Sequence, residues 1–260
     1  MLNPICQLLR YREAIRMLVV RDLAVRYSNS VLGVLWSLLN PLLMMGVFTL
    51  VFTFFMPSQI EKYPLYILTG LLPWNFFIAS LAGTVVSILQ NGPLVSRVYF
   101  PREILPLSVV LSNLINFLLA LSLLFVIMLV SGVRPGLSLL LLPGVILIQL
   151  LFSLGLGLFL AALNVQLRDT QAAVEVLTLA WFFVTPIIYP IDVIRSASLR
   201  LLLQVVNPMA SLIVSYRSIL YAGQMPDLRM LLITSAEVAL LLVVGYWFFR
   251  RASPTFAEEL

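Results

Sequence analysis

The chain has 260 residues, of which 62% are hydrophobic and only 10% are charged, and its mean hydropathy is +1.07. Soluble domains carry roughly a quarter charged residues because their surface faces water, so this composition excludes a soluble globular protein and predicts an all-α membrane protein with several spans. The net charge of +5 is almost entirely due to arginine, and the arginines stand at the ends of apolar runs, as topology determinants do, which argues against a nucleic-acid partner.

Several kinds of reactive site are excluded by residue type. The chain has no histidine and a single cysteine, Cys6, so no zinc site, disulfide framework or Cys/His nucleophile can be assembled. A phosphate-binding loop needs a lysine directly after a glycine, whereas the single lysine, Lys62, lies between Glu61 and Tyr63. We therefore expect no catalytic residues, no metal and no cofactor on this chain. If the protein works against a gradient, its energy must come from another chain or from an ion.

The first expected element is an amphipathic helix over residues 5–27. It carries five arginines, which are Arg10, Arg12, Arg16, Arg21 and Arg26. This charge is too high for the start of a cleaved signal peptide. One helical face is apolar and carries Leu8, Ile15, Leu18 and Val19. We expect this helix to lie along the cytoplasmic surface of the membrane.

Six apolar runs follow that are long enough to cross a bilayer, which needs about 20 residues. They cover residues 31–55, 65–89, 107–130, 137–163, 174–191 and 231–249, and the fifth is the shortest. We expect one domain over the whole chain, with the surface helix in residues 1–30, six transmembrane helices in 31–249 and a cytoplasmic tail at 250–260. Short inner loops then hold more arginines than short outer loops, which places both termini in the cytoplasm.

Two of these spans carry a small residue at every fourth position. The two sets are Ala79, Gly83 and Ser87, and Ser153, Gly157 and Ala161. This spacing lets helix backbones approach closely. The partner is either another helix of this chain or a second copy.

Aromatic residues near or within the spans are candidates for the lining of a channel: Trp36, Trp74, Phe77, Trp181, Phe182 and Tyr189. The interfacial belt explains aromatics near span ends, but not Trp181 and Phe182 at mid-span, for which packing against lipid is the commoner explanation. Aromatic faces could otherwise stack on sugar rings and let them slide. Glu237 is the only ionisable residue well inside a span, and a local hydrogen bond is its simplest role.

The stretch at residues 192–229 is apolar in two places without being long enough to span. These segments, 199–206 and 210–216, are separated by Asn207-Pro208, a turn signal. We expect short re-entrant helices in the outer leaflet. A small soluble outer subdomain is the alternative.

The inner loop at residues 90–106 combines opposite charges, Arg102 and Glu103, with the aromatic residues Tyr99 and Phe100. Three prolines restrict its backbone, so a push on the loop would move the adjacent spans. An ordinary inner loop with topological arginines is the alternative.

Four stretches carry a resemblance to a known family. They are residues 21–36 followed by Asn40-Pro41, residues 99–106, Asn207-Pro208 with Tyr216-Arg217, and residues 256–260. Together they resemble the type-2 ABC exporter permeases, most closely the branch that exports lipid-linked polysaccharides such as O antigen and teichoic acids.

The resemblance implies a homodimer in the bacterial cytoplasmic (inner) membrane, in which each copy binds a separate ATP-binding-cassette ATPase that holds ATP and Mg²⁺. The substrate would be a lipid-linked glycan. The loop coupled to the ATPase would comprise Arg97, Tyr99, Phe100, Pro101, Arg102 and Glu103. The surface helix would contribute Arg21, Asp22, Arg26 and Tyr27. The outer gate would comprise Asn207, Pro208, Tyr216 and Arg217.

Three other functions remain open at this point. A type-2 ABC permease for a drug or other small amphipathic molecule differs only in its substrate. An ion-coupled carrier is disfavoured because it would bury several acidic groups, whereas Glu237 stands alone. An intramembrane enzyme is disfavoured because the chain has neither a Ser–His pair nor an aspartate cluster.

Overall fold

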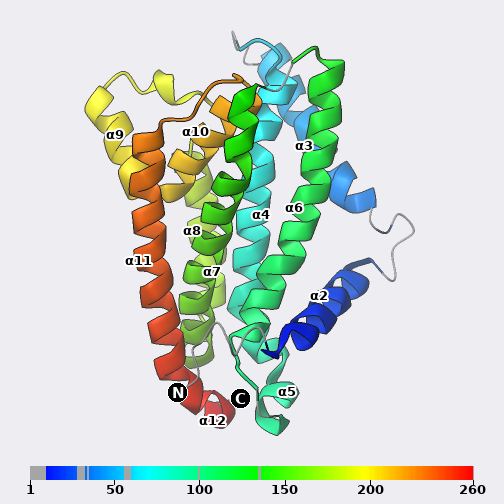
Figure 1. Ribbon diagram of the computed structural model, residues 1–260, viewed down its shortest axis with the longest axis vertical. Helices are drawn as coiled ribbons and strands as arrows, with labels where there is room; N and C mark the ends of the chain where they lie inside the picture. The colour runs from blue at the N-terminus through cyan, green and yellow to red at the C-terminus, as the bar shows by residue number, and fades with distance from the viewer. Residues whose placement is uncertain are drawn as a thin grey trace.

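The computed structural model describes residues 10–27, 33, 35–55, 60–98, 100–133 and 136–259, and every regular element in these ranges is helical (Figure 1). Four helices are long and apolar enough to cross a membrane: α4 (Tyr63–Gln90), α6 (Ile104–Val130), α7 (Leu142–Gln166) and α11 (Leu228–Ala252). A helix with the 27 residues of α6 is about 40 Å long, which exceeds the roughly 30 Å of the hydrocarbon layer. The second, third, fourth and sixth predicted spans are therefore confirmed as helices of spanning length.

The helices in the first and fifth predicted spans fall short of the length of the other four. α3 (Leu35–Leu50) continues into a π-helical turn (Val51–Phe55), and α8 (Thr170–Val184) ends well before residue 191. Thr185 has an extended backbone, with ψ at 134°, and it precedes Pro186, a position that disfavours helical backbone. The predicted outer boundary of the fifth span is thus wrong, although residues 38–50 and 170–184 form short apolar helices.

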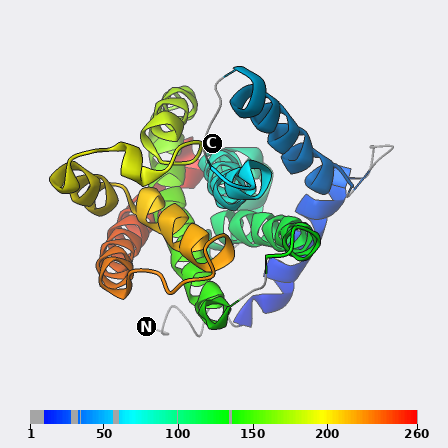
Figure 2. The same ribbon diagram turned by 90° about the horizontal axis from the view of Figure 1, so that it is seen from above.

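The central helix of the bundle is α4. It packs against α6 and α7 and also contacts α3 and α8, which lie on either side of it when the molecule is seen from above (Figure 2). Gln149 on α7 donates a buried hydrogen bond of 2.6 Å to the carbonyl of Pro73, within α4. Asn164, also on α7, donates one of 3.0 Å to the carbonyl of Val85. Polar side chains therefore join α4 and α7 at two levels of the bundle.

Glycines bring helix backbones into direct contact. A Cβ atom added to Gly245 on α11 would lie 2.1 Å from the carbonyl oxygen of Gly155 on α7, so no larger residue fits there. A Cβ atom on Gly157 would lie 2.6 Å from Oγ1 of Thr84 on α4. Gly157 belongs to one of the predicted small-residue sets, and its partner is a helix of the same chain.

Residues 192–229 form the two short helices that the sequence predicts. α9 (Ala197–Val206) and α10 (Pro208–Leu220) meet at an angle of 107°. Asn207 lies between them, and its Oδ1 accepts a hydrogen bond of 3.3 Å from the backbone N–H of Ala210, which caps the start of α10. No residue of α9 is buried, whereas most of α10 is. α10 is therefore part of the core, and α9 projects from the bundle (Figure 1).

The opposite end of the molecule holds α2 (Arg12–Tyr27), α5 (Gly92–Arg97) and α12 (Phe256–Glu259). α2 turns Leu18 and Val19 toward the protein and leaves Met17 exposed, so part of the apolar face predicted to lie on the membrane packs against the bundle instead. Leu8 lies outside the described residues. The segments predicted to be cytoplasmic thus gather at one end, and residues 192–229 lie at the other (Figure 1).

Candidate functional site

Arg217 lies at the centre of the contacts between α10 and the segment that follows α8. Its side chain is 8% exposed and donates hydrogen bonds to the carbonyls of Pro186 and Ile187, and one of 3.3 Å to the carbonyl of Tyr189. Its guanidinium carbon stands 3.8 Å from the centroid of the Tyr66 ring. No carboxylate of the described residues forms an ion pair with it. The positive charge is therefore balanced by carbonyl dipoles beyond the C-terminal end of α8, where a helix favours cations, and by the face of an aromatic ring.

Space for this arrangement depends on Gly70 on α4. A Cβ atom at this position would lie 3.0 Å from Nη2 of Arg217 and 3.1 Å from the carbonyl oxygen of Ile187. Both neighbours are fixed by the hydrogen bond between them, so neither can shift easily. Gly70 thus allows the guanidinium to lie close to the backbone of α4.

Asn207 ties the bent helix pair to α8. Its Oδ1 accepts a hydrogen bond of 2.9 Å from the indole N–H of Trp181, and its Nδ2 donates one of 3.0 Å to Oγ1 of Thr185. Pro208 occupies the first position of α10, where a missing N–H has no consequence. The structure therefore brings Asn207, a predicted gate residue, into contact with Trp181, a predicted channel residue.

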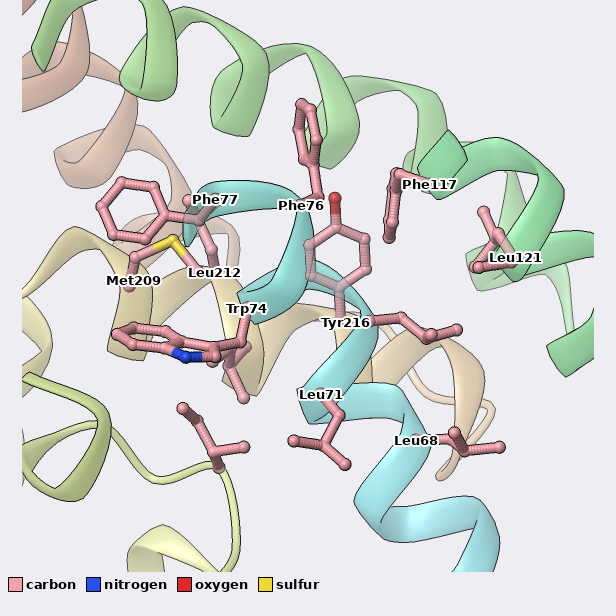
Figure 3. Packing of buried hydrophobic residues seen from close by; sticks show 14 of the residues in the cluster. Leu68, Leu71, Trp74, Phe76, Phe77, Phe117, Leu121, Met209, Leu212 and Tyr216 are labelled. Carbon is pink, nitrogen blue, oxygen red and sulfur yellow. The ribbon is translucent and has the colours of Figure 1, made fainter. Parts of the chain in front are cut away.

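Tyr216 anchors α10 in the core. It is fully buried, and its ring lies beside the stacked rings of Phe76 and Phe117 (Figure 3), with its centroid 6.1 Å from that of Phe117. Its hydroxyl has no hydrogen-bond partner among the described residues. The contact made by this side chain is therefore apolar, and it fixes α10 against α4 and α6.

Two tyrosine hydroxyls donate further hydrogen bonds at the end of the molecule that holds α10. Tyr63 donates to the carbonyl of Ile188 at 3.3 Å, and Tyr221 donates to the carbonyl of Glu61 at 2.6 Å. Burial raises the pKa of the Tyr221 phenol, Glu61 raises it further, and Arg217 lowers it. The phenol is therefore a neutral hydrogen-bond donor at physiological pH.

Four of the predicted channel aromatics pack on one another. Phe77 and Trp181 have ring centroids 5.2 Å apart, and Trp74 and Phe182 have theirs 5.7 Å apart. Trp74 and Phe77 are buried in the core of the chain, whereas Trp36 is 47% exposed and Trp181, Phe182 and Tyr189 are partly exposed. The lining role of all six stays a prediction, and the exposed group is the one that a ligand could reach.

The predicted coupling loop is held by the C-terminal end of the chain. Glu103 forms an ion pair of 3.8 Å with Arg250, and the guanidinium carbon of Arg102 lies 5.8 Å from the centroid of the Phe256 ring. Phe256 is fully buried and makes an edge contact with Phe249 on α11. A cavity of about 800 Å³ opens beside the loop, and Arg97, Phe100, Pro101, Arg102 and Glu103 line it. Tyr99 lies outside the described residues.

The predicted residues of the surface helix separate into two groups. Arg21 pairs with its neighbour Asp22 at 3.1 Å, which is a local contact. Arg26 instead reaches the bundle and donates a hydrogen bond of 2.9 Å to Oδ1 of Asn113 on α6. The side chain of Tyr27 lies outside the described residues.

Sequence reasoning missed several residues of these contacts, among them Tyr66, Gly70, Asn113 and Gln149. The only signal for Asn113 and Gln149 is an amide side chain inside an apolar run, which is costly in lipid without a partner. No comparable signal exists for Gly70 or Tyr66, because their role depends on a residue far away in the sequence.

Comparison with known proteins gives a consistent result over the whole chain. Residues 13–221 match the family described as ABC-2 type transporter. The chain is 40% identical over 260 residues to the O-antigen export system permease protein RfbA of Myxococcus xanthus, covering 100% of both chains. It is 33% and 32% identical over 241 residues to two proteins of the same name from Klebsiella pneumoniae, covering 92% of each chain.

Proposed function

Since the chain belongs to the ABC-2 type transporter family, we propose that it is the permease subunit of an ATP-driven exporter that moves a lipid-linked polysaccharide across the bacterial cytoplasmic membrane. The observation that carries this proposal is the similarity over the full length to relatives named O-antigen export permeases. The glycan would resemble O antigen or a teichoic acid in being attached to a lipid.

The proposed topology has six spans, formed by α3, α4, α6, α7, α8 and α11. α2 would lie on the inner surface, and α9 with α10 would form a re-entrant pair in the outer leaflet. The apolar character of α3 and α8 and the gathering of α2, α5 and α12 at one end (Figure 1) support this arrangement. Both termini would then face the cytoplasm, in agreement with the positions of the arginines.

A second copy of the chain would pack against the side formed by α3 and α8. Large apolar side chains on this side are exposed, including Val47 and Phe54 on or after α3 and Val176, Leu179 and Phe183 on α8. Lipid could cover some of them, but a homodimer would enclose a path between two copies. The path would be lined by the exposed aromatics Trp36, Trp181, Phe182 and Tyr189, on which sugar rings can stack.

The energy would come from two ATPase subunits that bind ATP and Mg²⁺ and dock at the end that carries α5. The cavity of about 800 Å³ beside Arg97, Phe100 and Arg102 supports this location. One side-chain nitrogen of Arg102, Nη1, is buried and has no hydrogen-bond partner among the described residues. A partner carboxylate that reached it would form a charge-assisted bond.

Deletion of the gene in the source bacterium tests the proposal. We expect glycan synthesis to continue, with the lipid-linked product retained on the inner face of the membrane, where an impermeant lectin reaches it only in inverted vesicles. Expression of the wild-type chain should restore surface glycan. Normal surface glycan in the deletion strain, or restoration of export without any ATPase partner, would refute the assignment.

A further inference from the structure

A cavity of about 490 Å³ with polar and apolar walls lies where α2, α3, α4 and α6 meet, apart from the contacts of Arg217 and from residues 97–103. Its polar lining consists of one cation and four amides, with an indole beside them. These residues are Arg26, Trp36, Asn40, Asn75, Asn113 and Asn116. No acidic residue lines the cavity, so its net charge is positive.

The cavity lies beside the middle part of helices that are long and apolar enough to cross a membrane. Asn75 stands near the middle of α4, whose 28 residues span about 42 Å. Asn113 is the tenth residue of α6, counted from Ile104, or about 14 Å from that end. Amide groups at such depths are unfavourable unless they hydrogen-bond, and polar residues within spans mark functional sites by default.

The donors of this cavity are only partly used by the protein. Nη1 of Arg26 donates a hydrogen bond of 2.9 Å to Oδ1 of Asn113, and Nδ2 of Asn113 donates one of 3.0 Å to the carbonyl of Val109. This chain of bonds fixes the guanidinium. No carboxylate of the described residues pairs with Arg26, and no hydrogen bond joins the side-chain amide of Asn40 or of Asn75 to another described residue.

An ordered guanidinium with free donors beside amide N–H groups matches the acceptor oxygens of a phosphate. The rest of the wall is apolar and comes from α3, α4 and α6, which suits a hydrocarbon chain and not a hydrated ion. Arg26, Trp36 and Asn40 are exposed at the surface of the bundle, so a lipid could enter sideways from the membrane.

We propose that this cavity binds the phosphate of a lipid, with Arg26 as the ionic contact and the amides of Asn40 and Asn75 on the remaining oxygens. Two lipids have the required chemistry: a membrane glycerophospholipid, and the phosphorylated polyprenyl carrier of a glycan. The second source rests on the proposed function, whereas the first does not, so the site can be tested even if the exported molecule is something else.

Equilibrium binding to the purified full-length chain in a neutral detergent tests the site. The probes are dioctanoyl phosphatidic acid, farnesyl phosphate, dioctanoylglycerol and inorganic phosphate, and native mass spectrometry counts the bound molecules. We expect both lipid phosphates to bind, whereas dioctanoylglycerol lacks the anion and inorganic phosphate lacks the chain. Tighter binding of phosphatidic acid would identify a membrane glycerophospholipid as the ligand, and tighter binding of farnesyl phosphate would identify the polyprenyl carrier.

Arg26→Gln should weaken binding of the lipid phosphates about tenfold or more, as expected for the loss of a charge-assisted contact. Arg16→Gln is the matched control, because it removes the same charge from an exposed position of α2 outside the cavity. Asn75→Leu should weaken binding less, without reducing the melting temperature of the chain. Equal binding of dioctanoylglycerol and phosphatidic acid, equal competition by inorganic phosphate, or equal affinities of the Arg26 and Arg16 variants would overturn the proposal.

Discussion

Replacement of Arg217 by methionine should destabilise the end of the molecule that holds α10. Methionine keeps much of the length of the side chain but cannot donate to the carbonyls of Pro186, Ile187 and Tyr189. Leaving a buried carbonyl without its hydrogen-bond donor costs about 1–3 kcal/mol. The contact with the Tyr66 ring is lost as well. We predict a loss of about 3 kcal/mol, because water can reach part of the exposed edge of the segment.

This loss can be measured as a fall in melting temperature. For a chain of this size, 1 kcal/mol corresponds to roughly 2–4 °C, so the melting temperature of Arg217→Met in detergent should fall by about 6–12 °C. The melting temperature of Arg217→Lys should fall by less, since lysine keeps the charge but lacks the planar set of N–H donors of a guanidinium. Arg229→Met is the control, because Arg229 is exposed at the same end of the molecule. If Arg217→Met and Arg229→Met have the same melting temperature, the carbonyl contacts do not stabilise this end.

Three further predictions concern the two ends of the bundle. Arg102→Ala should reduce copurification of the ATPase and export of glycan without changing membrane insertion, whereas Arg195→Ala should retain both. Phe256→Ala should lower the stability of the chain by about 3–5 kcal/mol, because it empties a fully buried site; an unchanged melting temperature would show that the tail is dispensable. With the native cysteine replaced by serine, a cysteine at Ser196 should react with an impermeant thiol reagent from outside and one at Ile213 should not, until nucleotide trapping of the ATPase changes the arrangement. Equal labelling at both sites would remove α10 from any gate.

Much of the fold follows from the apolar runs, because a bilayer imposes both length and composition on a span. Residues 65–89 and 107–130 are read correctly as α4 and α6 for this reason. The outer end of the fifth span fails because apolar residues continue past Pro186 although the helix does not. Hydropathy indicates whether a residue favours an apolar environment, but it does not indicate whether the backbone there is helical.

The contacts of the site were less accessible to sequence reasoning. Arg217 is visible as a gate residue by resemblance, but its partners are backbone carbonyls about thirty residues earlier, and every residue carries a carbonyl. The aromatics show a different limit. Phe77 and Trp36 are both aromatic residues within apolar runs, yet Phe77 is in the core and Trp36 is exposed. The apolar runs do not specify how each helix is rotated about its axis.

The contact between Gly155 and Gly245 has a mechanical consequence. α11 contacts Phe256 through Phe249 and Glu103 through Arg250. It reaches α10 through a buried hydrogen bond of 2.7 Å between Thr234 and Ser211. The backbone of α11 lies against that of α7 at Gly155 and Gly245. We therefore expect the two helices to move together as one rigid unit. Spin labels on α7 and α11 should therefore keep their separation when nucleotide is trapped. A displacement at the Arg250 end of α11 would then be shared by α7 along the bundle.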